Sequence, residues 1–215
     1  MQLTREKGKS IVDFHFMDYP HATGVKKAVN FLSEKIFIAR ANGKVPVVVC
    51  VGTDRSTGDS LGPFTGTILK NNFQTDLSVL GTIDEPVHAV NLDQIFAKLN
   101  YKYKYGENGK FIIAVDAAIG KHGRSGFVHI KEGPLYPGSG IGKDLSPVGH
   151  INVLGVVLET EERDEEKICF SLGTVRLRRV LVMSKIIANI IAEADKKALV
   201  LKRATDAIDK IQMLI

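Results

Sequence analysis

The stretch from Val47 to Pro63 constrains the fold more than any other part of this sequence. It begins with an unbroken run of valines and one cysteine, passes through a short polar loop after Val51, and becomes apolar again at Leu61. A run without polar alternation is typical of a strand that is covered on both faces in a parallel sheet. Pro63 suits the first turn of a helix, because its missing N–H would have no intrahelical partner there. We therefore predict a strand, a tight loop and a helix N-terminus.

Strand and helix patterns alternate along the rest of the chain. Apolar residues at helical spacing predict helices at residues 24–41, 61–71, 91–99 and 176–215. Apolar runs predict strands at 47–51, 77–83, 110–114, 126–131, 152–158 and 167–172, and residues 11–18 are either an edge strand or an extended arm. This alternation favours a parallel or mixed sheet with helices on both faces.

The length of 215 residues suits one α/β domain, because no Pro/Ser/Gly-rich linker divides the chain. We take residues 1–215 as this single domain, with an N-terminal arm at 1–23 and a C-terminal helical segment at 176–215. The longest uncharged apolar stretches are far short of the roughly 20 residues of a membrane span. The N-terminus lacks the apolar segment of a secretory signal, so we expect no membrane partner and a cytoplasmic location.

The C-terminal helical segment accounts for the whole net positive charge of the chain. It holds nine Lys/Arg and four Asp/Glu, which accounts for the formal net charge of +5. No aromatic residues interleave with these basic ones, so we interpret them as a solvated helix face and expect no nucleic-acid partner. The same segment has one apolar stripe that needs a partner, which is a second subunit in a homo-oligomer on our interpretation. The stripe consists of Leu201, Ala204, Ile208, Ile211 and Ile215.

Two aspartates follow buried strands, Asp59 after the 47–51 run and Asp116 after the 110–114 run. Because neighbouring parallel strands end at one edge of a sheet, we expect their carboxyl groups to approach each other. Two close carboxylates cannot both ionise cheaply, so one keeps a proton and acts as acid while the other acts as base toward water. The alternative is structural, with Asp59 as a helix N-cap and Asp116 as a turn or cap residue.

A glycine-rich segment at 132–144 resembles a phosphate-binding loop only superficially. A Walker-type loop needs glycine where Pro137 stands and Ser or Thr where Asp144 stands, so the match fails. The glycines of this segment still offer backbone N–H groups to an anion or to an extended peptide. The alternative is a simple connecting loop.

The remaining ligand-type side chains give weaker signals. None of the six histidines belongs to a compact metal-ligand pattern, and we expect no cofactor. His150 alone follows the glycine-rich segment closely enough to join Asp59 and Asp116 as a candidate divalent-metal ligand. Cys50 and Cys169 both lie in apolar runs, so we predict that they are buried core residues rather than a redox pair.

Four segments of the chain together resemble the YyaC-type sporulation proteins, which are relatives of the spore germination protease. These segments are CVGTDRSTGDSLGPFTG (50–66), GTIDEPVHAVNL (81–92), IIAVDAAIG (112–120) and YPGSGIGKDLSPVGHINVLGVV (136–157). The resemblance covers most of residues 45–160, in the same order. More distantly, the sequence is similar to the hydrogenase maturation peptidases. This implies a three-layer α/β/α sandwich of the phosphorylase/hydrolase-like type, with a mostly parallel or mixed central sheet.

The resemblance also implies roles for individual residues. The germination protease has an aspartate in a D-x-L-G-P motif and another in an I-D-A motif, which map onto Asp59 and Asp116 as an aspartic-type catalytic pair. Hydrogenase maturation peptidases use a glutamate directly after the first aspartate to recognise nickel; Ser60 stands there, so a nickel-dependent role is not expected. The P-G-S-G-x-G loop of the germination protease maps onto Pro137, Gly138, Ser139, Gly140 and Gly142.

We therefore predict an endopeptidase of endospore formation, located in the forespore or mother cell, that acts on a protein or peptide such as a spore protein. Asp59 and Asp116 activate water in this hypothesis. The residues expected to bind the substrate or stabilise its developing charge are Arg55, Thr57, Gly138, Ser139, Gly140 and Lys143. Two alternatives stay open: a non-catalytic sporulation factor that keeps the fold as a binding module, and an enzyme that binds an anion or a small molecule.

Overall fold

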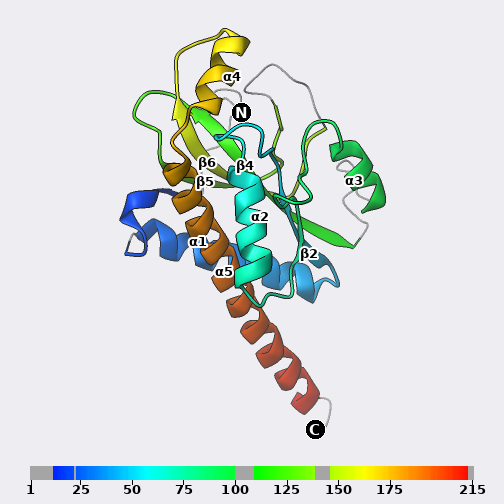
Figure 1. Ribbon diagram of the computed structural model, residues 1–215. Coiled ribbons are helices and arrows are strands. Elements are labelled where there is room, and N and C mark those ends of the chain that lie inside the picture. The colour runs from blue at the N-terminus through cyan, green and yellow to red at the C-terminus, as the bar shows by residue number, and fades with distance from the viewer. Residues whose placement is uncertain (1–11, 22, 100–108, 139–145, 213–215) are drawn as a thin grey trace.

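The computed structural model describes residues 12–21, 23–99, 109–138 and 146–212 (Figure 1). In chain order, the elements are β1 (Val12–His15), the 3₁₀ helix η1 (Phe16–Asp18), α1 (Thr23–Ala41), β2 (Val45–Cys50), α2 (Leu61–Asn72), β3 (Ser78–Leu80), α3 (Leu92–Lys98), β4 (Lys110–Gly120), β5 (Phe127–Glu132), β6 (Ile151–Glu159), α4 (Glu165–Gly173) and α5 (Leu177–Gln212). Most of these elements match the ranges that the sequence predicts.

The six strands form one mixed sheet in the order β1-β5-β6-β4-β2-β3. Strands β3, β2, β4 and β6 run parallel, β5 is antiparallel to β6, and β1 pairs antiparallel with β5 at the sheet edge. The predicted mostly parallel sheet is therefore confirmed, and residues 12–15 form an edge strand rather than an extended arm. At its centre, Cys50 of β2 lies opposite Val115 of β4.

Helices cover both faces of this sheet, which confirms the predicted three-layer α/β/α sandwich. Alternate residues of β4 enter different cores: Ile113 and Val115 pack with residues of α1, α2, α4 and α5, whereas Ile112 and Ala114 pack with residues of α3. The α3 face is also covered by Leu135, which pairs with Val148. Figure 1 shows α1, α2 and α5 together on one side of the sheet and α3 apart from them.

The segment predicted as a strand at 167–172 is a helix, α4. Its buried residues are Ile168 and Leu172, four positions apart on one helix face, whereas Phe170 between them is exposed. The Asp164 carboxylate caps this helix by accepting a hydrogen bond from the Lys167 N–H. A short apolar run is compatible with either a strand or a helix. Here the Asp164 cap favours the helix.

Two strands differ in length from the predictions. Strand β3 has three residues, where the pattern predicted seven, and β4 continues to Gly120 instead of ending at Ala114. The continuation of β4 is paired with β6, where Ala117 lies opposite Gly155 and Ala118 opposite Val156. Because β2 ends beside Val115, the last part of β4 has β6 as its hydrogen-bonded neighbour and, among the described residues, no strand on its β2 side.

The C-terminal helical segment is confirmed as one long helix, α5, through Gln212. Its first half, from Val180 to Ala192, is largely buried as predicted. Figure 1 shows its second half leaving the body of the protein toward the C-terminus. Within the described residues, no helix combines the length and the apolar character needed to cross a membrane.

Candidate active site

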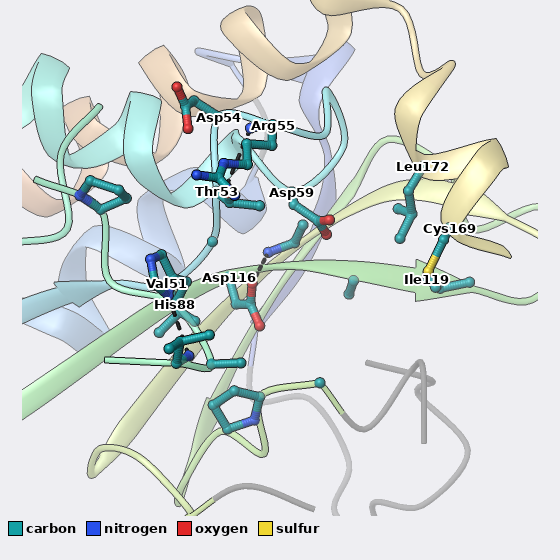
Figure 2. A pocket seen from close by; sticks show the side chains of 18 residues that line it. Val51, Thr53, Asp54, Arg55, Asp59, His88, Asp116, Ile119, Cys169 and Leu172 are labelled. Atoms are coloured by element: carbon teal, nitrogen blue, oxygen red, sulfur yellow. Dashed lines mark hydrogen bonds between the residues drawn. The ribbon is translucent and has the colours of Figure 1, made fainter. Parts of the chain in front are cut away.

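A cavity of about 650 Å³ opens where β2 ends and β4 continues (Figure 2). Five parts of the chain supply its walls: the β2–α2 loop, the segment before α3, the second half of β4, the segment after β5 and helix α4. Its lining residues are Val51, Gly52, Thr53, Asp54, Arg55, Asp59, Pro86, His88, Ala89, Val90, Asp116, Ala117, Ala118, Ile119, Pro137, Gly138, Cys169 and Leu172. The cavity therefore lies at the carboxyl end of parallel strands, where open α/β sheets bind ligands.

The β2–α2 loop is held against the rest of the protein by its backbone. The Gly52 N–H donates to the Val87 carbonyl at 2.8 Å, and the Gly58 N–H donates to the Leu172 carbonyl at 2.9 Å. The loop also closes on itself, because a Cβ atom added to Gly52 would lie 2.0 Å from the Asp59 carbonyl oxygen. Gly52 has φ +143°, a conformation that side chains rarely adopt. Glycine at position 52 thus fixes the path of the loop that carries Asp59.

Asp59 lies half-buried in this loop and lines the cavity. It is not the helix N-cap that the structural alternative required. Helix α2 begins at Leu61, and its N-cap is Ser60, whose hydroxyl donates to the Thr57 carbonyl at 2.6 Å. Pro63 falls in the first turn of α2, as predicted.

Asp116 lies inside β4 and is only 7% exposed. The prediction that it follows the strand is wrong, and so is the alternative of a turn or cap residue. Its carboxylate Oδ1 accepts a hydrogen bond from the Ala117 N–H at 2.8 Å. Burial raises the pKa of the Asp116 carboxyl to about 7, and the negative charge of Asp59 adds to the rise. At neutral pH this carboxyl group therefore carries a proton for much of the time.

The two aspartates lie on the wall of the same cavity, although 57 positions separate them in the sequence. Figure 2 shows their side chains between His88 on one side and Cys169 with Leu172 on the other. The influence of Asp59 on the pKa of Asp116 indicates that the groups are close enough to interact electrostatically. Asp59 is partly open to solvent, whereas Asp116 is buried, so their surroundings favour different protonation states.

Of the predicted substrate-binding residues, the structure places two, Arg55 and Gly138, in the wall of the cavity. Arg55 is exposed and lines the cavity, as does Gly138. Thr57 does not line it, and its carbonyl is used to accept the Ser60 hydroxyl. The remaining predicted residues, Ser139, Gly140 and Lys143, lie outside the described residues.

His150 does not join the two aspartates. Its Nδ1 atom accepts a hydrogen bond from the Ile112 N–H at 3.0 Å, and its ring stacks on Phe111. Ile112 precedes Asp116 by four strand residues, which corresponds to about 13 Å along β4. Burial lowers the pKa of His150, which leaves its imidazole neutral. Among the described residues, no group of three or more His, Cys, Asp or Glu is arranged to hold a metal ion.

The sequence analysis did not predict two residues that line the cavity, His88 and Cys169. His88 stands in the segment before α3, and its Nδ1 atom accepts the Val90 N–H at 3.3 Å. Cys169 was predicted to be a core residue but is exposed on α4, whereas Cys50 is buried as predicted. The signal for His88 was its place in the GTIDEPVHAVNL segment. No sequence feature indicated that Cys169 lines the cavity, because its exposure depends on residues 165–173 forming a helix and not a strand.

Comparisons with known proteins support the YyaC part of the resemblance found in the motifs. Residues 16–190 match the family described as "Protein of unknown function (DUF1256)". The chain is 39% identical over 181 residues to "Uncharacterized protein YyaC" of Bacillus subtilis (strain 168), covering 84% of this chain and 83% of that protein. Among solved structures, the [NiFe] hydrogenase maturation protease HycI from Thermococcus kodakarensis KOD1 is similar with a TM-score of 0.40 and 14% identity, over 73% of this chain and 98% of HycI.

Proposed function

The chain belongs to the family described as DUF1256, and we propose that it hydrolyses peptide bonds with Asp59 and Asp116 as its acid–base pair. The observation that carries this proposal is the pairing of a buried, proton-holding Asp116 with a half-buried Asp59 in one open cavity. A carboxylic acid that stays protonated near neutral pH can donate its proton, and a nearby carboxylate can accept one from water.

The proposed reaction proceeds through a tetrahedral intermediate without a covalent bond to the enzyme. Asp59 takes a proton from a water molecule as the water oxygen attacks the carbonyl carbon of the scissile bond. Asp116 donates its proton to the carbonyl oxygen at the same time, which neutralises the charge that develops there. The intermediate then collapses: the amine leaves with the proton held by Asp59, and the carbonyl oxygen returns its proton to Asp116.

The other walls of the cavity support a peptide as the substrate. Val90, Ile119 and Leu172 provide apolar surface for a substrate side chain, and Arg55 provides a positive charge at the rim for a carbonyl or carboxylate. The opening is lined by the backbone of Gly52 and Gly138 as well as by side chains, which suits a substrate with its own backbone groups.

We further propose that the substrate is a protein of endospore formation, cleaved in the forespore or mother cell. This part rests on the motifs that resemble the YyaC-type sporulation proteins and the germination protease. Small acid-soluble spore proteins are therefore the first substrates to test.

The decisive experiment compares Asp59→Asn and Asp116→Asn with the wild-type chain on these spore proteins, from pH 5 to pH 9. Removing either member of an acid–base pair is expected to lower the cleavage rate by about 10²–10⁴-fold. Wild-type cleavage should also fall as pH rises above about 7, because Asp116 then loses the proton that it donates.

Asp54→Asn is the matched control, since Asp54 is an exposed carboxylate of the same loop and also lines the cavity. The Asp54 carboxylate points away from Asp59 and Asp116 in Figure 2, so we expect this variant to cleave at nearly the wild-type rate. Unchanged cleavage by both the Asp59 and Asp116 variants would reject the mechanism. No cleavage by the wild-type chain, together with tight binding of a spore protein, would instead favour a binding module.

A further inference from the structure

Helix α5 carries one continuous apolar seam with heptad spacing along its whole described length. Its successive positions are Val180, Met183, Ile187, Ile190, Ala194, Lys197, Leu201, Ala204, Ile208 and Ile211. Steps of three and four residues keep these side chains on one face of the helix, and Lys197 is the only charged residue among them. The same face therefore meets two different environments along α5.

The first half of the seam is part of the protein core. The five seam residues from Val180 to Ala194 are at most 2% exposed, and α5 packs here against α1 and α2. The Lys197 ammonium donates to the Asn30 side chain of α1, which marks the end of this contact. Beyond Ala198 the seam is uncovered, with Leu201, Ile208 and Ile211 exposed by 41%, 55% and 60%. Three large apolar side chains exposed on one face of a projecting helix indicate an interaction surface.

We propose that a second copy of this chain covers the exposed seam, by pairing its own α5 end antiparallel to the first. Reversal brings complementary layers together: Leu201 of each copy meets Ile211 of the other, and Ala204 meets Ile208. In the two inner layers the large Ile208 thus packs against the small Ala204, and in the two outer layers Leu201 packs against Ile211. The interface is isologous, so two copies satisfy it completely.

The body of the protein excludes the parallel arrangement. A parallel partner would follow the seam toward Ile190, where α1 and α2 already lie. In the antiparallel arrangement, Gln212 of the second copy, the last described residue of its α5, lies level with Val200, which is outside the part of α5 that the body covers. The two bodies then stand at opposite ends of a short helix pair.

The charges next to the seam agree with this arrangement. The flanking positions Val200, Thr205, Ala207 and Gln212 are uncharged, so no like charges meet at close range. Further from the seam, Arg203 of one copy lies level with Asp209 of the second copy, and Lys202 lies level with Lys210. In a parallel pair, each of these charged side chains would lie beside the identical side chain of the second copy. The opposed helix dipoles also favour the antiparallel pair.

Sedimentation equilibrium of the full chain over a range of concentrations tests the proposal. We expect the mass to approach twice the 23.5 kDa of one chain and to fall toward 23.5 kDa on dilution. Ile208→Glu should remain at the mass of one chain at every concentration, because it puts a charge into the inner layers. Since Ile208 is exposed, its thermal unfolding at low concentration should match that of the wild type.

Lys210→Glu is the control, because Lys210 is exposed on the opposite side of α5, and it should dimerise like the wild type. Orientation is tested by mixing Ala204→Cys and Ile208→Cys chains that both also carry Cys169→Ser. Oxidation should give mainly the mixed disulfide, whereas a parallel pair would give the two homodisulfides. A wild-type chain that stays monomeric, an Ile208→Glu dimer, or dominant homodisulfides would each overturn the proposal.

Discussion

Two buried aspartates lie near opposite ends of the strands, Asp195 in α5 and Asp116 in β4, and their surroundings differ in how they affect the carboxylate charge. Asp195 of α5 is 1% exposed and forms an ion pair with Arg40 at 2.6 Å, while its second oxygen accepts the Asp76 N–H at 3.1 Å. Asp116 is 7% exposed, and burial raises its pKa to about 7. Groups around the first carboxylate stabilise its charge, whereas burial and the charge of Asp59 favour the protonated form of the second, against the opposing hydrogen bond from the Ala117 N–H.

The comparison separates a structural carboxylate from a candidate catalytic one. Arg40 ends α1, and Asp76 precedes β3, so Asp195 connects three parts of the fold beside the amino ends of the strands. Asp116 instead faces a cavity at the carboxyl ends, together with Asp59. A carboxyl group that reduces the stability of the fold when it ionises, and that faces a cavity, is typical of a functional residue.

The largest expected effect is the loss of stability in Asp195→Asn. The change leaves the Arg40 guanidinium, which is 11% exposed, buried without its anion. Removing one partner of a buried ion pair costs about 3–5 kcal/mol, and we expect this decrease in the free energy of unfolding at pH 7. Urea unfolding measures it. Asp209→Asn, an exposed change on the same helix, should stay within about 0.5 kcal/mol of the wild type. A comparable loss in both variants would show that the ion pair is not the cause.

An effect of opposite sign is expected for Asp116→Asn. The pKa of Asp116 is about 7 in the folded chain against 3.8 for an ordinary aspartate, so the folded state binds more protons between these pH values. Stability from this group is therefore present below pH 4 and is lost as pH rises through 7. The asparagine variant should exceed the wild type by roughly 2–4 kcal/mol at pH 8 and equal it near pH 4.

Urea unfolding at the two pH values measures this gain, and Asp54→Asn, which changes an exposed carboxylate, should show no gain at either. A destabilised Asp116→Asn at pH 8 would make the two buried aspartates alike and remove the comparison. A stable variant that also fails to cleave spore proteins would separate function from folding at this position.

Much of this arrangement could be predicted from the sequence, because the signals are local. The valine run of β2, the proline at position 63 and the helical spacing in α1 and α5 each depend on a short window of residues. The loop after β2 was predicted to be a functional site for the same reason. The apolar stripe from Leu201 to Ile211 was likewise visible, although Ile215, its last predicted member, lies outside the described residues.

The features that could not be predicted depend on long-range pairing. Asp116 interrupts an apolar run, so the pattern ended the strand there; only its pairing with β6 shows that β4 continues to Gly120. Cys169 reaches the cavity because Asp164 caps a helix in which Ile168 and Leu172 turn inward. His150 follows a suitable loop, yet its hydrogen bond to Ile112 holds it at the start of β4. In each case a tertiary contact overrides the local pattern.

The smallest expected effect tests the coupling between the two carboxyl groups of the cavity. Asp59→Asn removes the negative charge that adds to the raised pKa of Asp116, whereas burial, the larger cause, remains. We expect the pKa of Asp116 to fall by roughly one unit, equal to about 1.4 kcal/mol, and to stay above that of an ordinary aspartate. A carboxyl ¹³C NMR titration of the folded variant measures the shift, with Asp54→Asn as the control that leaves it unchanged.

An unaltered pKa would mean that the carboxyl groups are too far apart to share a water molecule, and an ordinary pKa would mean that burial is not the main cause. Either result would undo the contrast with Asp195, because Asp116 would then no longer be a buried acid tuned by its neighbour.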